Sequence, residues 1–181
     1  MKYKIIQAAQ DEIRLKSLSF TMDDLVRRLG ISKKTIYQHI SSKEEIIGEI
    51  LLRMKKDMER KQIELFNDKN ISTVDKMKGL LKISPTNDEL ITPITLNQLK
   101  RSFPRLYTKV NDIYHFSWDR FNAVYADGLG KGEVNPFDVE FFKELYITAV
   151  TNLFEVPSMS KYSYSQIVEK TVEQLFNGVE K

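Results

Sequence analysis

The chain has 181 residues, of which 41% are hydrophobic and 29% are charged. This composition is ordinary for a globular protein and excludes a disordered or fibrous chain. Cysteine is absent, which excludes disulfides and thiolate metal sites, and no apolar run approaches the roughly 18 residues that a membrane span needs. We therefore expect a cytoplasmic protein without a membrane partner.

The positive charge lies at the beginning of the chain. The net charge of +3 is too small to indicate nucleic-acid binding by itself. Residues 1–43, however, contain nine Lys and Arg against four Asp and Glu, whereas the remaining 138 residues contain 19 basic and 21 acidic residues. This distribution favours a nucleic-acid contact in the N-terminal part and a slightly acidic body behind it.

Apolar residues recur at helical spacing along almost the whole chain, and alternating strand-like runs are missing, so the sequence predicts an all-α fold. A first helix is expected over about residues 3–15, with Ile5, Ile6, Ala9 and Ile13 on one face. A second short helix follows Thr21, a typical N-cap residue, and ends at Gly30, which can adopt the left-handed conformation.

A third helix, from Lys33 to about His39, is capped by Ser32 and turns Ile36 and Ile40 inward. Two short helices joined by a tight turn that contains glycine form a helix-turn-helix, whose second helix enters the major groove of DNA. Its exposed face would therefore read and hold double-stranded DNA.

The residue types on this face suggest separate roles in DNA recognition. Side chains at the start of the third helix can reach base edges, Gln38 can pair with adenine, and Tyr37 and His39 can donate to phosphates. Ser42 would cap a fourth helix that begins at Lys43, so that backbone amides and the lysine charge hold a phosphate. The predicted DNA-binding residues are Thr21, Arg28, Ser32, Lys33, Lys34, Thr35, Tyr37, Gln38, His39 and Lys43.

The segments AAQDEI and TMDDLVRRLGISKKTIYQHISSKEEI closely resemble the N-terminal module of the TetR family of repressors, over roughly residues 3–50. The sequence departs from the family pattern at three places. Glycine is missing from the turn after the first helix, and this turn, Lys16 to Phe20, is one residue shorter than in the family pattern. The family also usually has Ala near Val26 and Phe at the position of Ile40. We therefore expect the first helix to end differently here.

The resemblance implies a DNA-binding domain over residues 1–45 and a helical regulatory and dimerisation domain over residues 46–181. It also implies a homodimeric repressor that places two recognition helices in successive major grooves of a pseudo-palindromic operator, about 34 Å apart. A small-molecule effector would release the operator. A regulator without an inducer, or an activator, is the alternative.

Beyond the N-terminal module, a long connecting helix is expected over residues 43 to about 66, followed by breaks at 67–70, 84–87 and 102–105. The strongest predicted break is GLGKGEVNP at residues 128–136, because it holds three glycines and ends in proline. Helical stretches are expected on either side of it.

Two late segments, 136–154 and 163–177, carry broad apolar faces that could pair with a second copy in a four-helix interface. The predicted interface residues are Phe142, Leu145, Tyr146, Ala149, Leu153, Ile167, Thr171, Val172 and Leu175. Because periodicity does not separate an interface from an ordinary core, the alternative is that these stripes are the core of a monomer.

Aromatic residues are dense over residues 103–125, as in a cavity for an apolar or flat effector, although a plain core has the same pattern. The predicted pocket residues are Phe103, Tyr107, Tyr114, His115, Trp118 and Phe121. The chain has only two histidines and no carboxylate at metal spacing, so we expect no metal site and no cofactor.

Several catalytic signatures are missing from the sequence. No glycine-rich phosphate loop follows a strand, no serine is flanked by glycines, and no His-Glu pair has metalloprotease spacing. Gly128 to Val134 superficially resembles a phosphate loop, but its glycine pattern is wrong and no strand precedes it. We therefore do not expect an enzyme, and the slightly acidic body argues against a nonspecific DNA-packaging protein.

Overall fold

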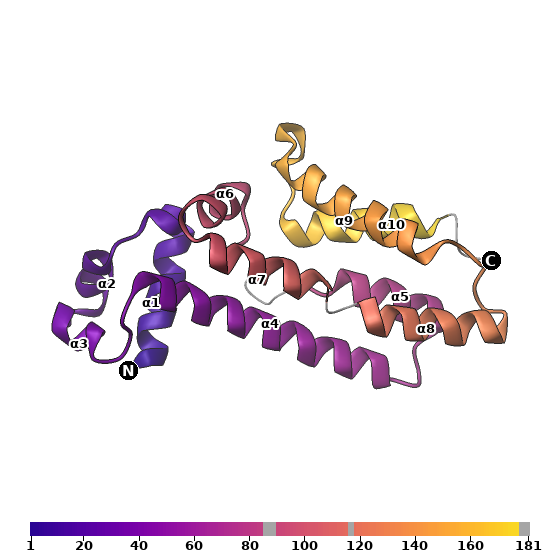
Figure 1. Ribbon diagram of the computed structural model, residues 1–181, viewed down its shortest axis with the longest axis horizontal. Helices are drawn as coiled ribbons and strands as arrows, with labels where there is room; N and C mark the ends of the chain where they lie inside the picture. The colour runs from indigo at the N-terminus through magenta and orange to yellow at the C-terminus, as the bar shows by residue number, and fades with distance from the viewer. Residues whose placement is uncertain (85–89, 116–117, 178–181) are drawn as a thin grey trace. The chain divides into compact units, whose positions relative to one another are not determined.

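The structure, a computed structural model, describes residues 1–84, 90–115 and 118–177, with the backbone alone for 111–115. Regular structure in these ranges is entirely helical, which confirms the predicted all-α class (Figure 1). None of the helices in these ranges is long and apolar enough to cross a lipid bilayer. The helices are α1 (Lys2–Lys16), η1 (Ser17–Ser19), α2 (Met22–Leu29), α3 (Lys33–Tyr37), α4 (Lys43–Asn67), α5 (Thr73–Lys82), α6 (Pro93–Ser102), α7 (Pro104–His115), α8 (Trp118–Lys131), α9 (Val139–Glu155), η3 (Pro157–Met159) and α10 (Tyr164–Phe176).

The chain forms two compact units. The first combines residues 1–56 with 89–112, and the second combines 57–88 with 113–181. The first unit therefore holds the three predicted N-terminal helices together with α6, which lies far from them in the sequence. The proposed functional boundary at residue 45 stays a prediction.

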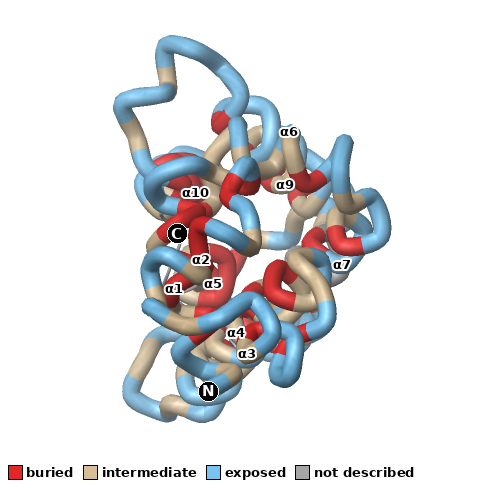
Figure 2. Tube along the Cα trace, turned by 90° about the vertical axis from the view of Figure 1, so that its left-hand side faces the viewer, coloured by how far each residue is buried: buried red, intermediate tan, exposed pale blue. Residues whose placement is uncertain are grey.

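The core of the first unit is built from the inward faces of the N-terminal helices. Ile5, Ile6, Ala9 and Leu25 are fully buried there, as is Ile36 of α3. In Figure 2, buried stretches of the N-terminal helices alternate with exposed ones, as expected for helices with one face in a core. The predicted inward positions of α1 and α3 are confirmed.

The turn after α1 differs from an ordinary helix end, as the missing glycine led us to expect. A single turn of 3-10 helix, η1, follows α1, and Ser17 at its start has φ 51° and ψ −146°. Among the described residues other than glycine, Ser17 alone has a positive φ. A residue with a Cβ is strained in this region, whereas glycine adopts it readily.

The second unit is organised around α8 and α9. α5 packs on α8, and α10 packs on both α9 and α5; Figure 1 shows α9 and α10 side by side. Aromatic rings fill the space between them. Phe121 stacks on Phe142 with ring centroids 5.7 Å apart, and Phe142 meets Phe176 edge to face at 5.6 Å. Such offset and edge-on pairs are the arrangements that aromatic rings prefer.

The predicted break at residues 128–136 is partly wrong, because α8 continues through Gly128 and Gly130 to Lys131. Gly128 lies against α5, and a Cβ built on it would be 2.4 Å from Cγ2 of Thr73. This glycine therefore serves close helix packing rather than termination. The chain leaves the helix only at Gly132, whose φ is 70°.

Two other helix boundaries lie a few residues from the predicted positions. α3 ends at Tyr37 instead of His39, and α9 begins at Val139 instead of near Pro136. The reason at α9 is that Asp138 caps the helix, since its side chain accepts a hydrogen bond from the backbone N–H of Phe141. The predicted turn at 84–87 lies, except for Ser84, outside the described residues.

Replacing Gly128 with alanine should destabilise the fold, whereas the same change at Gly130 should not. The added methyl at Gly128 would overlap the stiff, β-branched Thr73, an overpacking cost of about 1–3 kcal/mol that exceeds the gain in helix propensity. At Gly130 no atom lies within 4 Å of the added methyl, so only a propensity gain of up to about 1 kcal/mol remains. Urea unfolding of both variants measures the difference, and equal stabilities would contradict the packing role.

Candidate DNA-binding site

α2 begins and ends at residues with clear local causes. Thr21 and Asp24 form a capping box: the Thr21 side chain accepts from the Asp24 N–H, and the Asp24 carboxylate accepts from the Thr21 N–H at 2.8 Å. At the other end Gly30 is left-handed, with φ 65° and ψ 27°, and its N–H donates to the carbonyl of Val26. These two ends fix the length of α2 and the direction of the turn that follows.

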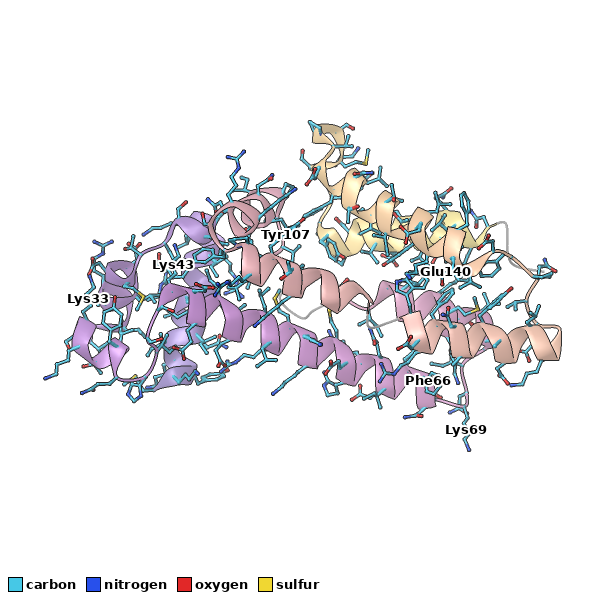
Figure 3. All side chains as sticks on the ribbon, viewed as in Figure 1. Lys33, Lys43, Phe66, Lys69, Tyr107 and Glu140 are labelled. Carbon is cyan, nitrogen blue, oxygen red and sulfur yellow. The ribbon has the colours of Figure 1, made fainter. Side chains whose placement is uncertain are left out.

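α3 presents one apolar and one polar side. Ser32 caps it by accepting a hydrogen bond from the Thr35 N–H at 3.1 Å, and Ile36 is fully buried beneath it. The outward side of α3 and the two residues after it are exposed and form what we call the recognition surface, which consists of Lys33, Lys34, Tyr37, Gln38 and His39. Figure 3 labels Lys33 on this helix. The structure therefore brings together, on one exposed surface, these five of the predicted DNA-binding residues.

Three predicted site residues in and next to α3 already have side-chain partners within the protein. The Lys33 ammonium lies 3.0 Å from a carboxylate oxygen of Asp23 on α2, which raises the pKa of Lys33. The Thr35 hydroxyl lies 2.9 Å from the Ser32 hydroxyl. Both Lys33 and Asp23 are about half exposed or more, so this ion pair is weak and Lys33 can exchange it for a phosphate.

Lys43 and Arg28 are placed differently from what a phosphate contact requires. The Lys43 ammonium donates to the carbonyls of Leu18 and Phe20 and lies 4.5 Å from the centroid of the Phe20 ring. Burial lowers the pKa of Lys43. Arg28 donates to Glu12 at 2.7 Å. Their predicted DNA contacts stay predictions, and the structure gives both side chains a role in holding the helices together.

The start of α4 agrees with the predicted cap. Ser42 accepts a hydrogen bond from the N–H of Glu45 at 3.0 Å, and the Glu45 carboxylate accepts from the N–H of Ser41 at 2.7 Å. Lys2 of α1 pairs with the same carboxylate and with Glu49. This end of α4 is thus tied to α1, which fixes it relative to the other N-terminal helices.

A charged cluster that the sequence analysis missed connects α1 to α2. Asp24 is buried and accepts from Lys16 at 2.7 Å, from Thr21 and from Arg27. Glu12, also buried, pairs with Arg28 and with Lys16. The available signal was the Thr21–Asp24 capping box, but the partners of Asp24 from α1 appear only in the folded chain.

The charged cluster should make the protein less stable in acid. Hydrogen bonds from Lys16 and Thr21 hold the pKa of Asp24 well below its ordinary value, and Arg28 lowers the pKa of Glu12. A carboxylate whose pKa is depressed in the folded state contributes stability above its unfolded pKa of about 4 and loses it as the pH falls through the folded value.

We therefore expect the melting temperature to fall steeply below about pH 4. Replacing Asp24 with asparagine should lower the melting temperature at pH 7 by several degrees and flatten its pH dependence. Circular dichroism melts between pH 7 and 3 measure both effects, with Asp68→Asn, at a carboxylate far from this cluster in the sequence, as the control. A variant as pH-sensitive as the parent would contradict this assignment.

The predicted pocket residues fall into different parts of the chain. Phe103 and Tyr107 belong to the first unit, where the Lys43 ammonium lies 6.0 Å from the Phe103 ring centroid. Trp118 and Phe121 belong to the second unit and are buried, with ring centroids 5.1 Å apart. The side chains of Tyr114 and His115 lie outside the described residues. Pocket lining stays a prediction for all six.

The predicted interface residues divide into buried and exposed groups. Phe142, Tyr146, Ile167, Thr171 and Val172 are buried within the second unit. Leu145 and Leu153 are 44% and 37% exposed, and Ala149 and Leu175 are half-buried. The first group lies in the core of the second unit itself, and contact of the other four with a second copy stays a prediction.

The decisive comparison concerns the N-terminal helices. The family described as "Bacterial regulatory proteins, tetR family" matches residues 5–50, which comprise most of α1, all of α2 and α3, and the start of α4. The chain is a TetR-family transcriptional regulator. The matched region contains the helix-turn-helix and its recognition surface.

Relatives of this TetR-family regulator cover nearly its whole length. The curated protein described as "Uncharacterized HTH-type transcriptional regulator YvaF", from Bacillus subtilis, is 24% identical over 169 residues, which is 92% of this chain and 89% of that protein. The Bacillus subtilis FadR crystal structure, in complex with stearoyl-CoA, has a TM-score of 0.69 at 18% identity and covers 98% of this chain and 99% of that one. A regulator of the TetR/AcrR family from Thermobifida fusca has a TM-score of 0.71 at 18% identity, covering 98% and 97%. These structures share the fold.

Proposed function

We propose that this TetR-family regulator is a repressor that binds a pseudo-palindromic operator as a homodimer. The observation that carries the proposal is the division of α3 into a buried apolar side, at Ile36, and the exposed recognition surface. A short helix anchored in this way can enter the major groove without exposing the core of its own domain. Occupying the operator would block transcription.

Dimerisation is supported by apolar side chains that the described part of the second unit leaves exposed. Phe141 is 68% exposed, Leu145 and Leu153 follow it along α9, and Val156 comes directly after the helix. Beside them a groove of about 230 Å³ runs between α9 and α10, lined by Ala149 and Thr171 among others. Contiguous apolar surface of this kind marks an interaction site, and a C2 dimer would cover it.

Release by a small molecule is the second part of the proposal. The related FadR structure contains stearoyl-CoA, and the second unit of this chain has a cleft of about 470 Å³, lined by Phe66, Lys69, Lys76 and Lys131 among others. This volume is within the range of small-molecule sites. A ligand could bind better to a state in which the two DNA-binding domains of the dimer are a different distance apart. Such a ligand would shift the dimer away from the operator.

Selection from random duplex DNA by the purified protein, followed by sequencing, tests the proposal. We expect an enriched site with two inverted half-sites, and binding that weakens steeply with salt. Salt-sensitive binding without an enriched site would reduce the protein to a nonspecific binder. Transcription from a promoter that carries the enriched site then separates repression from activation, and a lack of response to any ligand class would favour a regulator without an inducer.

A further inference from the structure

The turn that joins α1 to α2 adopts a backbone conformation that its sequence disfavours. Ser17 has φ 51° and ψ −146°, a region that glycine populates and residues with a Cβ avoid. A strained residue persists only where its surroundings hold it in place. The turn therefore needs contacts from outside itself.

Those contacts come from two other helices of the same unit. The N–H of Leu18 donates to Oε1 of Gln98 on α6 at 2.7 Å, and Nε2 of Gln98 donates to the Ser19 hydroxyl at 2.9 Å. The Lys43 ammonium of α4 donates hydrogen bonds to the carbonyl of Leu18 and, at 2.6 Å, to that of Phe20. Both backbone groups of Leu18, whose side chain is buried, are thus satisfied by side chains far away in the sequence.

Gln98 and Lys43 differ in what their removal would do. Lys43 also covers the Phe20 ring and begins α4, so its loss would disturb the core of the unit. Gln98 is half-buried, and the two hydrogen bonds of its side-chain amide both go to the turn. Its removal therefore acts first on the hydrogen bonds of the turn.

We propose that Gln98 is a positioning residue for DNA binding, because it holds the Ser17–Ser19 turn in the strained conformation that sets the direction of α2 and, through Gly30, of α3. The proposal rests on the proposed function. α2 begins three residues after the turn, at Met22, so a relaxed turn would displace the recognition surface relative to α1. A region far from the helix-turn-helix in the sequence thereby completes it.

The test measures affinity for the enriched duplex with the full-length chain. Gln98→Ala should weaken binding about tenfold, which is the decrease in affinity expected when two hydrogen bonds are removed. Adding Ser17→Gly should restore the affinity to within about twofold, because glycine adopts the turn conformation without help. Asn97→Ala, at the exposed neighbouring position on α6, is the matched control and should bind like the parent.

Two results would overturn the proposal. One is parental affinity in Gln98→Ala, and the other is a loss that Ser17→Gly does not restore, since Gln98 would then act elsewhere than through the turn. If the parent enriches no duplex, the proposed function fails instead. The effect of Gln98 on the turn is then measured without DNA, from hydrogen exchange of the Leu18 amide. Faster exchange in Gln98→Ala than in Asn97→Ala supports the role of Gln98 in holding the turn, and equal exchange overturns it.

Discussion

Replacing Lys33 and Lys34 together with alanine is expected to lower operator affinity by roughly 100-fold at moderate salt. Both side chains are exposed at the start of α3, where a helix in the major groove approaches base edges and phosphates. A dimer loses four cations at once, so fewer counterions are released on binding and the dependence on salt becomes shallower. The slope of log K against log salt should fall by about two to four.

Lys56→Ala with Lys109→Ala is the matched control, because it removes the same charge from exposed positions outside the recognition surface and outside the proposed effector cleft. It should leave affinity and slope nearly unchanged. Fluorescence anisotropy over a range of salt concentrations measures both quantities. If the two double variants lose affinity equally, net charge and not the recognition surface governs binding.

Replacing Leu145 with glutamate is expected to convert the proposed dimer to monomers. Leu145 is 44% exposed on α9, beside Phe141, which is 68% exposed. On the protomer surface a glutamate at this position is solvated, so the fold should survive. In a dimer interface the same carboxylate would be buried without a partner, at a cost of several kcal/mol.

Sedimentation equilibrium measures the dimer constant, and thermal melting confirms that the variant is folded. Thr151→Glu adds the same charge to an exposed position on α9, roughly a third of a turn round the helix from Leu145, and should remain dimeric. Monomers should also bind a duplex with two half-sites much more weakly than the dimer does, since the two DNA-binding domains then bind independently. A Leu145→Glu dimer of unchanged constant would place the interface elsewhere.

The local sequence was enough to predict the helix-turn-helix and most helix boundaries. Thr21, Ser32 and Ser42 act through hydrogen bonds to residues three positions along, and Gly30 acts through its own φ, so each signal is contained within a few residues. The split of α3 into buried Ile36 and an exposed polar face follows in the same way from helical periodicity. These features explain why the family resemblance and the fold agree over the N-terminal helices.

The interpretation of glycine and apolar residues needed the tertiary structure. Gly128 looked like a helix breaker, yet it lies within α8, where Thr73 of α5 occupies the space that a Cβ would need. Phe142 and Leu145 carry the same periodic signal, yet the first is buried by Phe121 and Phe176 while the second is exposed. A period shows that a face is apolar but not what covers it.

The sequence by itself determined the helical class, the N-terminal helix-turn-helix and its family, because capping, periodicity and charge distribution are local properties of the chain. Only the tertiary structure decided how the strained turn at Ser17 is held. Its hydrogen bonds come from Gln98 and Lys43, which are distant in sequence and become neighbours only after folding. Long-range partners of this kind leave no local pattern, since each is selected by geometry that exists in the folded protein alone.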